Sequence, residues 1–169
     1  MSVELPDLSP DDIFGALARH NVDYVVIGGV AAILHGAPYN TGDIDICPSR
    51  KPDNLVRLAS ALTDLDARIY ASELSEGLPF DRSAEMLERA GIWNLVTRAG
   101  RLDVSFLPSG TQGYDDLLRD VVHYDIHGLS VPTASLADVI RSKEAAGRPK
   151  DQWILHTLRQ MLDHTDPPG

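Results

Sequence analysis

The sequence contains a single cysteine, Cys47, so it can form no internal disulfide, and its six histidines show no zinc-ligand spacing. No apolar run approaches the roughly 20 residues that a membrane-spanning helix requires. The first residues, MSVELPDLSPDD, are acidic and do not resemble the basic, apolar start of a signal peptide. Cations are also scarce, because 15 Lys and Arg residues stand against 25 Asp and Glu residues, a net charge of −10. These absences predict a soluble, cytoplasmic protein without membrane contact, and they oppose non-specific binding to nucleic acid.

The remaining composition is that of an ordinary globular protein, with 169 residues, 43% hydrophobic and 24% charged. Helix-like and strand-like segments alternate along the first half, several strands follow, and two helices end the chain. This order predicts an α/β (α+β) fold in which helices flank a mixed β-sheet. We expect one domain over residues 1–169, with its core at about 9–162 and a frayed tail at 163–169.

The segment 23–48 is the most informative part of the chain; its sequence is DYVVIGGVAAILHGAPYNTGDIDICP. Residues 24–27 form an apolar, β-branched run that predicts a buried strand, which ends at Gly28 and Gly29. Residues 30–34 predict a short helix that stops at the glycine and proline of HGAP. The backbone N–H groups at the start of such a helix are free to bind an anion such as a phosphate.

Two acidic strands follow the glycine turn. Residues 42–47, GDIDIC, alternate, so Asp43 and Asp45 project to one face while the isoleucines pack on the other. Residues 92–97 and 101–106 predict a hairpin, and its second strand places Asp103 on a polar face. If the two acidic strands are neighbours, three carboxylates converge, and such oxygen ligands suit two Mg²⁺ ions, with Mn²⁺ as a substitute. The alternative is that all three are solvated surface aspartates.

The glycine pair, the helix and the Asp-x-Asp strand, in this order, resemble the polymerase-β-like nucleotidyltransferase superfamily. The segments GGVAAILHG and TGDIDI are most similar to the toxin-type nucleotidyltransferases of bacterial abortive-infection systems and their small relatives. The lincosamide and aminoglycoside nucleotidyltransferases share the plan. This resemblance implies that Gly28, Gly29 and Thr41 contact a nucleoside triphosphate, and that Asp43, Asp45 and Asp103 hold metal. In two departures from the family pattern, Gly29 replaces a common serine and Tyr39 replaces a common arginine.

A basic segment near the C-terminus carries four cations within ten residues: Arg141, Lys143, Arg148 and Lys150. They suit a helix C-terminus, where positive charge is favourable and solvated. The segment SKEAAGRPKD also resembles the basic motif of the abortive-infection group. That resemblance implies that Lys143, and with it Lys150, binds the triphosphate, and that Asp151 is a further, weaker candidate.

Together these resemblances predict a Mg²⁺-dependent nucleotidyltransferase with the catalytic set Asp43, Asp45, Asp103 and Lys143. It would bind an NTP and modify RNA, in particular a tRNA end, as a toxin paired with an antitoxin protein. One alternative is a small-molecule nucleotidyltransferase of the aminoglycoside or lincosamide type, which the acidic composition favours. A second is a nucleotide-binding or interaction module that has lost transfer, and a third is a metal-dependent glycosyltransferase.

Two further segments give expectations about shape. Residues 71–91 are irregular apart from a short helix near 83–90, and they form either one wall of a substrate cleft or an inert surface loop. The last helix should bury one apolar stripe, formed by Trp153, Ile154, Thr157, Leu158, Met161 and Leu162.

Overall fold

A mixed sheet of eight strands forms the centre of the protein. The structure, a computed structural model, describes residues 5–165. The strands are β1 Tyr24–Ile27, β2 Asp43–Pro48, β3 Arg68–Ala71, β4 Leu74–Leu78, β5 Ile92–Thr97, β6 Gly100–Ser105, β7 Val122–Ile126 and β8 Leu129–Thr133. They lie in the order β4-β3-β5-β6-β2-β1-β8-β7, with β2–β6 and β1–β8 parallel and all other neighbours antiparallel. The predicted single domain with a mixed sheet and flanking helices is confirmed.

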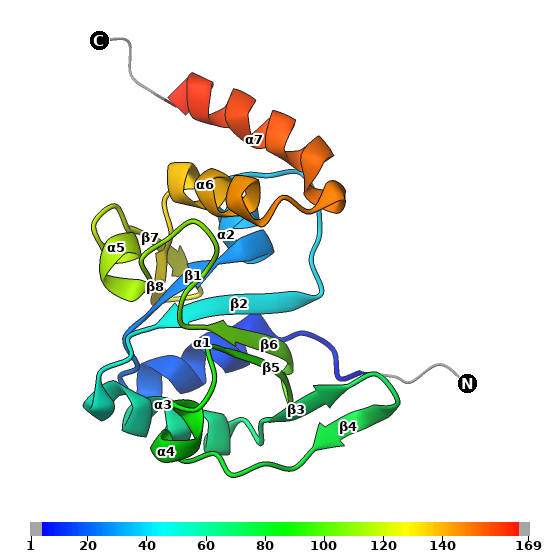
Figure 1. The fold of residues 1–169 in the computed structure, drawn as a ribbon, viewed down its shortest axis with the longest axis vertical. Coiled ribbons are helices and arrows are strands. Elements are labelled where there is room, and N and C mark those ends of the chain that lie inside the picture. The colour runs from blue at the N-terminus through cyan, green and yellow to red at the C-terminus, as the bar shows by residue number, and fades with distance from the viewer. Residues whose placement is uncertain (1–4, 166–169) are drawn as a thin grey trace.

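Helices cover both faces of this sheet. They are α1 Pro10–Arg19, α2 Gly28–Leu34, α3 Pro52–Asp64, α4 Ala84–Leu87, α5 Tyr114–Leu118, α6 Leu136–Ala146 and α7 Gln152–Thr165, with a 3₁₀ turn, η1, at Pro149–Asp151. In Figure 1, α1 and α3 lie on one side of β2, whereas α2, α6 and α7 lie on the other. The polar face of β2 therefore looks towards α2 and α6.

Apolar residues on one face of β2 and β6 fix the orientation of both strands. Ile44, Ile46, Leu102 and Val104 are each 0% exposed, and burying an aliphatic side chain contributes about 1.5–3 kcal/mol. A shift of one residue in either strand would turn these side chains out of the core. The odd-numbered residues of both strands are consequently held on the opposite, polar face.

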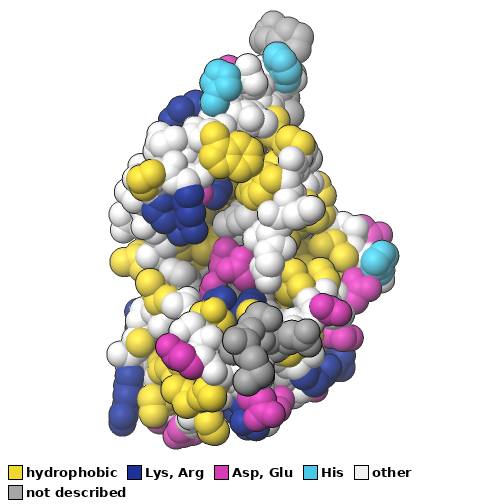
Figure 2. Space-filling view, turned by 90° about the vertical axis from the view of Figure 1, so that its right-hand side faces the viewer, with side chains coloured by type: hydrophobic (Ala, Val, Ile, Leu, Met, Phe, Trp, Pro, Cys, Tyr) yellow, Lys and Arg dark blue, Asp and Glu magenta, His cyan; other side chains and the backbone are white. Residues whose placement is uncertain are grey.

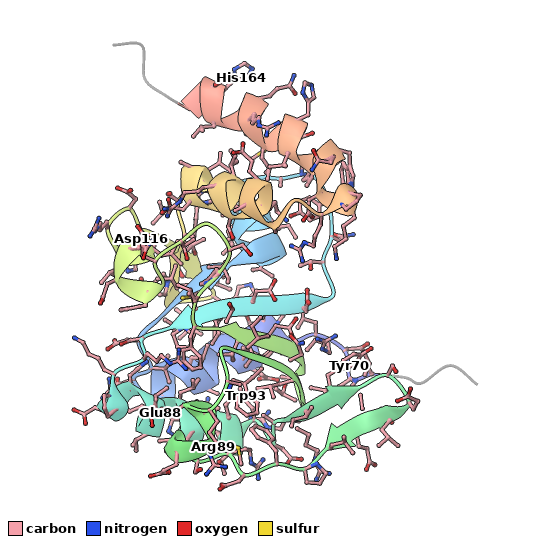
Figure 3. All side chains as sticks on the ribbon, viewed as in Figure 1. Tyr70, Glu88, Arg89, Trp93, Asp116 and His164 are labelled. Carbon is pink, nitrogen blue, oxygen red and sulfur yellow. The ribbon has the colours of Figure 1, made fainter. Side chains whose placement is uncertain are left out.

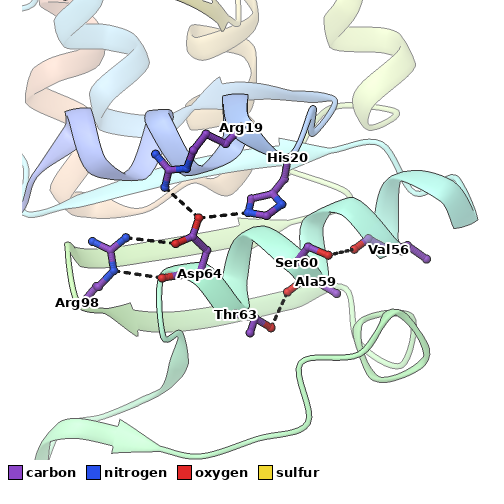
Figure 4. A network of polar contacts seen from close by, with 8 residues as sticks. All are labelled: Arg19, His20, Val56, Ala59, Ser60, Thr63, Asp64 and Arg98. Atoms are coloured by element: carbon purple, nitrogen blue, oxygen red, sulfur yellow. Dashed lines mark hydrogen bonds and ion pairs between the residues drawn. The ribbon is translucent and has the colours of Figure 1, made fainter.

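A network around Asp64 joins elements that are distant in sequence (Figure 4). The Asp64 carboxylate, at the end of α3, accepts hydrogen bonds from Arg19 at 2.9 Å and from Arg98 at 3.5 Å, and lies 3.1 Å from His20 Nε2. Arg98 also donates from Nε to the Asp64 backbone carbonyl at 3.1 Å. The network ties α1, α3 and the turn between β5 and β6 together.

Most predicted elements are present, but two predictions need correction. Residues 71–91 contain a strand, β4, that pairs with β3, and only α4 lies in the predicted helix at 83–90. The stripe predicted for α7 is wrong at Trp153, which is 62% exposed, whereas Leu155 is 1% exposed. The buried stripe of α7 is Ile154, Leu155 and Leu158. The face that packs on α6 is therefore rotated by about one residue from the face that the sequence predicted.

The remaining boundaries differ little from expectation. The second helix begins at Gly28 itself, two residues before the predicted start, and α7 continues through Thr165, beyond the predicted end of the core at 162. The rest of the predicted tail, 166–169, lies outside the described residues. Among residues 5–165, no helix is both long and apolar enough to cross a membrane.

Candidate active site

Three aspartates meet on the polar face of β2 and β6. The parallel register sets Asp45 directly opposite Asp103, and Asp43 lies two residues before Asp45 on the same face. One carboxylate oxygen from each of the three lies within 4.8 Å of the others. The sequence predicted that the three carboxylates would converge if the two acidic strands were neighbours. β2 and β6 are neighbours, and the carboxylates do converge.

Burial and like charge act together on Asp45. Desolvation, followed by the charges of Asp43 and Asp103, raises the pKa of Asp45 to about 7. Gly28 lies directly against this carboxylate: a Cβ at Gly28 would overlap it, and φ at Gly28 is +66°. The glycine turn and the acidic strand are thus packed in a way that leaves no room for a side chain.

Asp103 has an intramolecular counter-ion. The Arg101 guanidinium donates to Asp103 Oδ1 at 2.7 Å and lies 3.9 Å from the ring centre of Tyr70, which Figure 3 labels on β3. Burial and a hydrogen bond with Asp43 still raise the pKa of Asp103 to about 6, although Arg101 opposes the shift. Sequence reasoning missed Arg101; the available signal was its position two residues before Asp103, on the same face of a strand.

The donor set of the triad fits a hard divalent cation. All three ligands are carboxylate oxygens, which Mg²⁺ and Mn²⁺ prefer over nitrogen or sulfur. After burial, the charges of Asp43 and Asp103 contribute to the raised pKa of Asp45, so the ionised carboxylates repel one another and a cation between them would relieve that repulsion. The cluster therefore presents three ligands of the kind that could hold a divalent ion.

Thr41 occupies the space beside the second glycine. A Cβ at Gly29 would lie 3.1 Å from Thr41 Oγ1, and the same hydroxyl donates to Asp43 Oδ1 at 3.0 Å. Gly29 stands where the nucleotidyltransferases that the sequence resembles commonly have a serine, and Thr41 places a hydroxyl next to that position. Thr41 also restrains the first aspartate of the triad.

The basic segment forms one wall of the site. Lys143, on α6, is 8% exposed, and its Nζ lies 3.4 Å from Asp151 Oδ1. Arg148 Nε donates to the other carboxylate oxygen of Asp151 at 2.9 Å. Asp151 therefore holds both cations beside the triad, which gives this residue a clearer structural role than the sequence suggested.

Two cavities border the triad, and both include Gly28, Asp45, Asp103, Lys143 and Arg148. The α7-side cavity, of about 520 Å³, continues past Gly29, Thr41 and Lys150 to Tyr39 and Trp153. The β5-side cavity, of about 380 Å³, continues past Asn94, Ser105 and Ser142. Figure 2 shows a hollow in which acidic side chains lie beside basic and hydrophobic ones. Both volumes suit small ligands.

Every site residue that the sequence predicted lines the α7-side cavity: Gly28, Gly29, Thr41, Asp43, Asp45, Asp103, Lys143 and Lys150. Arg148, Trp153 and Asn94 were not among the predicted site residues, yet they also line these cavities. Residues 71–91, which the sequence offered as one wall of a cleft, line neither cavity.

The sequence matches a family model described as "Nucleotidyltransferase of unknown function (DUF6036)" over residues 13–166. The chain belongs to this nucleotidyltransferase family. No curated protein sequence matches it significantly.

Several solved structures share the nucleotidyltransferase fold. The lincosamide antibiotic adenylyltransferase LnuA, solved with lincomycin, is 14% identical, with a TM-score of 0.59 over 92% of this chain and 99% of that one. ANT(2″)-Ia, solved with adenylyl-2″-tobramycin, is 15% identical, with a TM-score of 0.51 over 92% and 86%. An antigenic nucleotidyltransferase-like protein from Paracoccidioides brasiliensis is 19% identical, with a TM-score of 0.53 over 95% and 80%. At these identities the likeness establishes the fold.

Proposed function

We propose that this protein is a Mg²⁺-dependent nucleotidyltransferase that moves a nucleoside monophosphate from an NTP to an acceptor hydroxyl and releases pyrophosphate. The observation that carries the proposal is the convergence of Asp43, Asp45 and Asp103 beside a cavity lined by a glycine turn and by Lys143. In the reaction, a bond forms between the acceptor oxygen and the α-phosphorus, the bond from the α-phosphorus to the pyrophosphate oxygen breaks, and the proton of the acceptor hydroxyl passes to solvent.

The three carboxylates have distinct proposed roles. Asp43 would bridge two metal sites, Asp45 would complete the site nearer the nucleotide, and Asp103 would complete the site nearer the acceptor. When bound, two divalent ions stabilise the attacking and leaving oxygens of an in-line displacement. Arg101 holds Asp103 in position, and Thr41 restrains Asp43.

The two cavities suit the two substrates. The α7-side cavity combines the glycine turn, the Thr41 hydroxyl and the cations Lys143, Arg148 and Lys150, all of which can bind phosphate oxygens. It therefore suits the triphosphate of the donor NTP. The β5-side cavity lies on the Asp103 side of the triad and adds hydroxyl and amide groups from Ser105, Ser142 and Asn94, so it suits the acceptor.

The first candidate acceptor is RNA, in particular a tRNA end, with the protein acting as a toxin that a separate antitoxin protein controls. Its support is the similarity of the segments at 28–45 and 143–151 to the abortive-infection group, together with the cations in the second segment. This candidate predicts that expression of the native protein, but not of Asp43→Asn, arrests bacterial growth.

A second candidate acceptor is a cationic small molecule of the aminoglycoside or lincosamide type. The observation that favours it over RNA is that the β5-side cavity adds only neutral residues to those shared with the α7-side cavity, and so offers no further cations to a polyanionic backbone. The net charge of −10 also favours a cation over a polyanion. Two of the similar structures were solved with a lincosamide or an adenylylated aminoglycoside.

The deciding assay measures pyrophosphate release and transfer of label from each of the four NTPs in the presence of Mg²⁺. Total tRNA and a panel of aminoglycosides and lincosamides serve as acceptors. Asp43→Asn should abolish transfer and keep the native circular dichroism spectrum, and the exposed Asp81→Asn is the matched control. An active Asp43→Asn protein would contradict the assignment, and NTP binding without release would favour the module that has lost transfer.

A further inference from the structure

Trp153 is placed unusually for a large apolar side chain in the first turn of a packed helix. The neighbouring residues Ile154 and Leu155 are 2% and 1% exposed and face the core, whereas Trp153 is 62% exposed. Its indole is turned away from the core of the protein and lines the α7-side cavity. Burial in the core therefore does not account for this side chain.

Tyr39 restricts the position of the indole. Its ring is partly buried and packs against the hydrophobic core, and its hydroxyl oxygen is buried. The ring centres of Tyr39 and Trp153 are 6.0 Å apart, with the planes inclined at 74°, which is a favourable edge contact. Trp153 is thus a solvent-accessible aromatic surface supported by a residue that is anchored in the core.

The α7-side cavity consequently has two chemically different parts. One is the phosphate-binding part already described, formed by the glycine turn and the cations beside the triad. The other is aromatic and contains Tyr39 and Trp153. A nucleotide has the same division, because its phosphates are anionic and its base is a flat aromatic ring.

We propose that Trp153, supported by Tyr39, is the surface on which the base of the donor NTP stacks. The inference rests on the proposed function, since it assigns the α7-side cavity to the NTP. Stacking on an aromatic side chain tolerates every base, because each base has a π-face. It also gives a role to the aromatic ring at position 39, where the resembled enzymes commonly have an arginine: the Tyr39 ring supports Trp153.

The test compares binding of intact NTPs with binding of tripolyphosphate, which has the phosphates but no base. Titrations with Mg²⁺ use the non-hydrolysable α,β-methylene analogue of each NTP, on the native protein, Trp153→Ala and Trp153→Phe. We expect Trp153→Ala to weaken binding of the best NTP analogue by about tenfold, within the range measured for loss of one stacked base. Binding of tripolyphosphate should not change, and Trp153→Phe should keep most of the affinity.

Fluorescence provides an independent readout, because the protein has two tryptophans. The other, Trp93, stacks on Phe80 and donates to the Leu87 carbonyl, far from α7 (Figure 3). In a Trp93→Phe protein, NTP should quench the emission of Trp153 and tripolyphosphate should not. Native NTP affinity in Trp153→Ala, or equal loss of NTP and tripolyphosphate affinity, would overturn the inference.

Failure of the proposed function gives a different result. If the native protein binds NTP through Trp153 but releases no pyrophosphate with any acceptor, the stacking inference stands and the proposed transferase function is wrong. A native protein that binds neither NTP nor tripolyphosphate overturns both.

Discussion

At the scale of single residues, the clustered carboxylates should make the metal-free protein less stable as pH rises. Folding raises the pKa of Asp45 from its ordinary value near 3.8 to about 7. The folded state therefore holds this proton more tightly, so the stabilisation is complete below about pH 4 and is lost as pH rises through 7. One pKa unit corresponds to ~1.4 kcal/mol, so the loss is on the order of a few kcal/mol.

Asp45→Asn removes this charge and provides the measurement. In excess chelator, we expect the variant to unfold at a temperature near the native value at pH 4, and roughly 5–10 °C above it at pH 8. Added Mg²⁺ should stabilise the native protein at pH 8 and have little effect on the variant. A constant difference between the two proteins from pH 4 to pH 8 would contradict the electrostatic account.

Gly28 should tolerate no side chain, for two separate reasons. A Cβ at this position would overlap the Asp45 carboxylate, and φ at Gly28 is +66°, which strains other L-residues. We expect Gly28→Ala to reduce transfer at least 100-fold and to lower stability by roughly 1–3 kcal/mol. Gly42→Ala is the matched control, because a Cβ there meets nothing within 4 Å. Equal effects of the two changes would contradict the packing argument.

The sequence predicted the residues of the triad but not the contacts of Arg101 or the exposure of Trp153. Alternation along each strand is a local property, so Asp43, Asp45 and Asp103 could be assigned to polar faces without a structure. The contact of Arg101 with Tyr70 depends on the pairing between β3 and β5, which no local pattern contains. The exposure of Trp153 depends on how α7 packs against α6. The apolar positions of a helix define which face is buried only to within about one residue.

At the scale of elements, α6 matters because it carries Lys143 into the site. Its N-cap, Ser135, accepts a hydrogen bond from the Asp138 backbone N–H at 3.1 Å. Ser9 is at the equivalent position of α1, where its side chain makes no capping hydrogen bond. Ser135→Ala should therefore cost about 1 kcal/mol, a fall of roughly 2–4 °C in Tm, and Ser9→Ala should cost less than about 0.5 kcal/mol. Thermal unfolding of both variants tests this, and an equal loss would show that capping by Ser135 is unimportant.

The elements that sequence reasoning identified are those with strong internal patterns. The helices α1 and α3 have apolar residues at helical spacing and a proline in the first turn, which are strong local signals for a helix. The strand β4, LSEGL, has no alternation of apolar and polar residues and exists because it pairs with β3. Edge strands of this kind depend on their partner, and sequence alone does not reveal the partner.

At the scale of the whole molecule, the parallel pairing of β2 with β6 creates the site. The hairpin of β5 and β6 is adjacent in sequence and was predictable from its turn, whereas the β2–β6 pairing joins distant segments. The alternation of residues along the two strands does not show whether they are neighbours. The resemblance to nucleotidyltransferases led us to expect that they are, because it implies that Asp43, Asp45 and Asp103 hold metal together. The glycine turn, the two acidic strands and the basic segment are local patterns, so the types of side chain in the site could be predicted from the sequence. The order of the strands in the sheet could not, and it is known from the structure.

The Asp64 network should stabilise the whole domain in a pH-dependent manner, because it joins α1, α3 and the β5–β6 turn (Figure 4). Hydrogen bonds from Arg19 and His20 hold the pKa of Asp64 below its ordinary value. The carboxylate is the favoured form in the folded state, so its stabilisation is present above the ordinary pKa near 3.8 and is lost as pH falls below it. The effect should be modest, since the ion pairs are solvated.

Asp64→Asn should consequently lower the unfolding temperature at pH 7, and the difference from the native protein should close towards pH 3. Ser60→Ala is the matched control on the same helix, because the Ser60 hydroxyl donates within α3, to the Val56 carbonyl at 3.2 Å. That variant should show no such pH dependence. Because the β5–β6 turn leads directly into the strand that carries Asp103, Asp64→Asn should also weaken Mg²⁺ binding slightly at pH 7. Unchanged stability of Asp64→Asn at pH 7 would show that the packed core alone holds these three elements together.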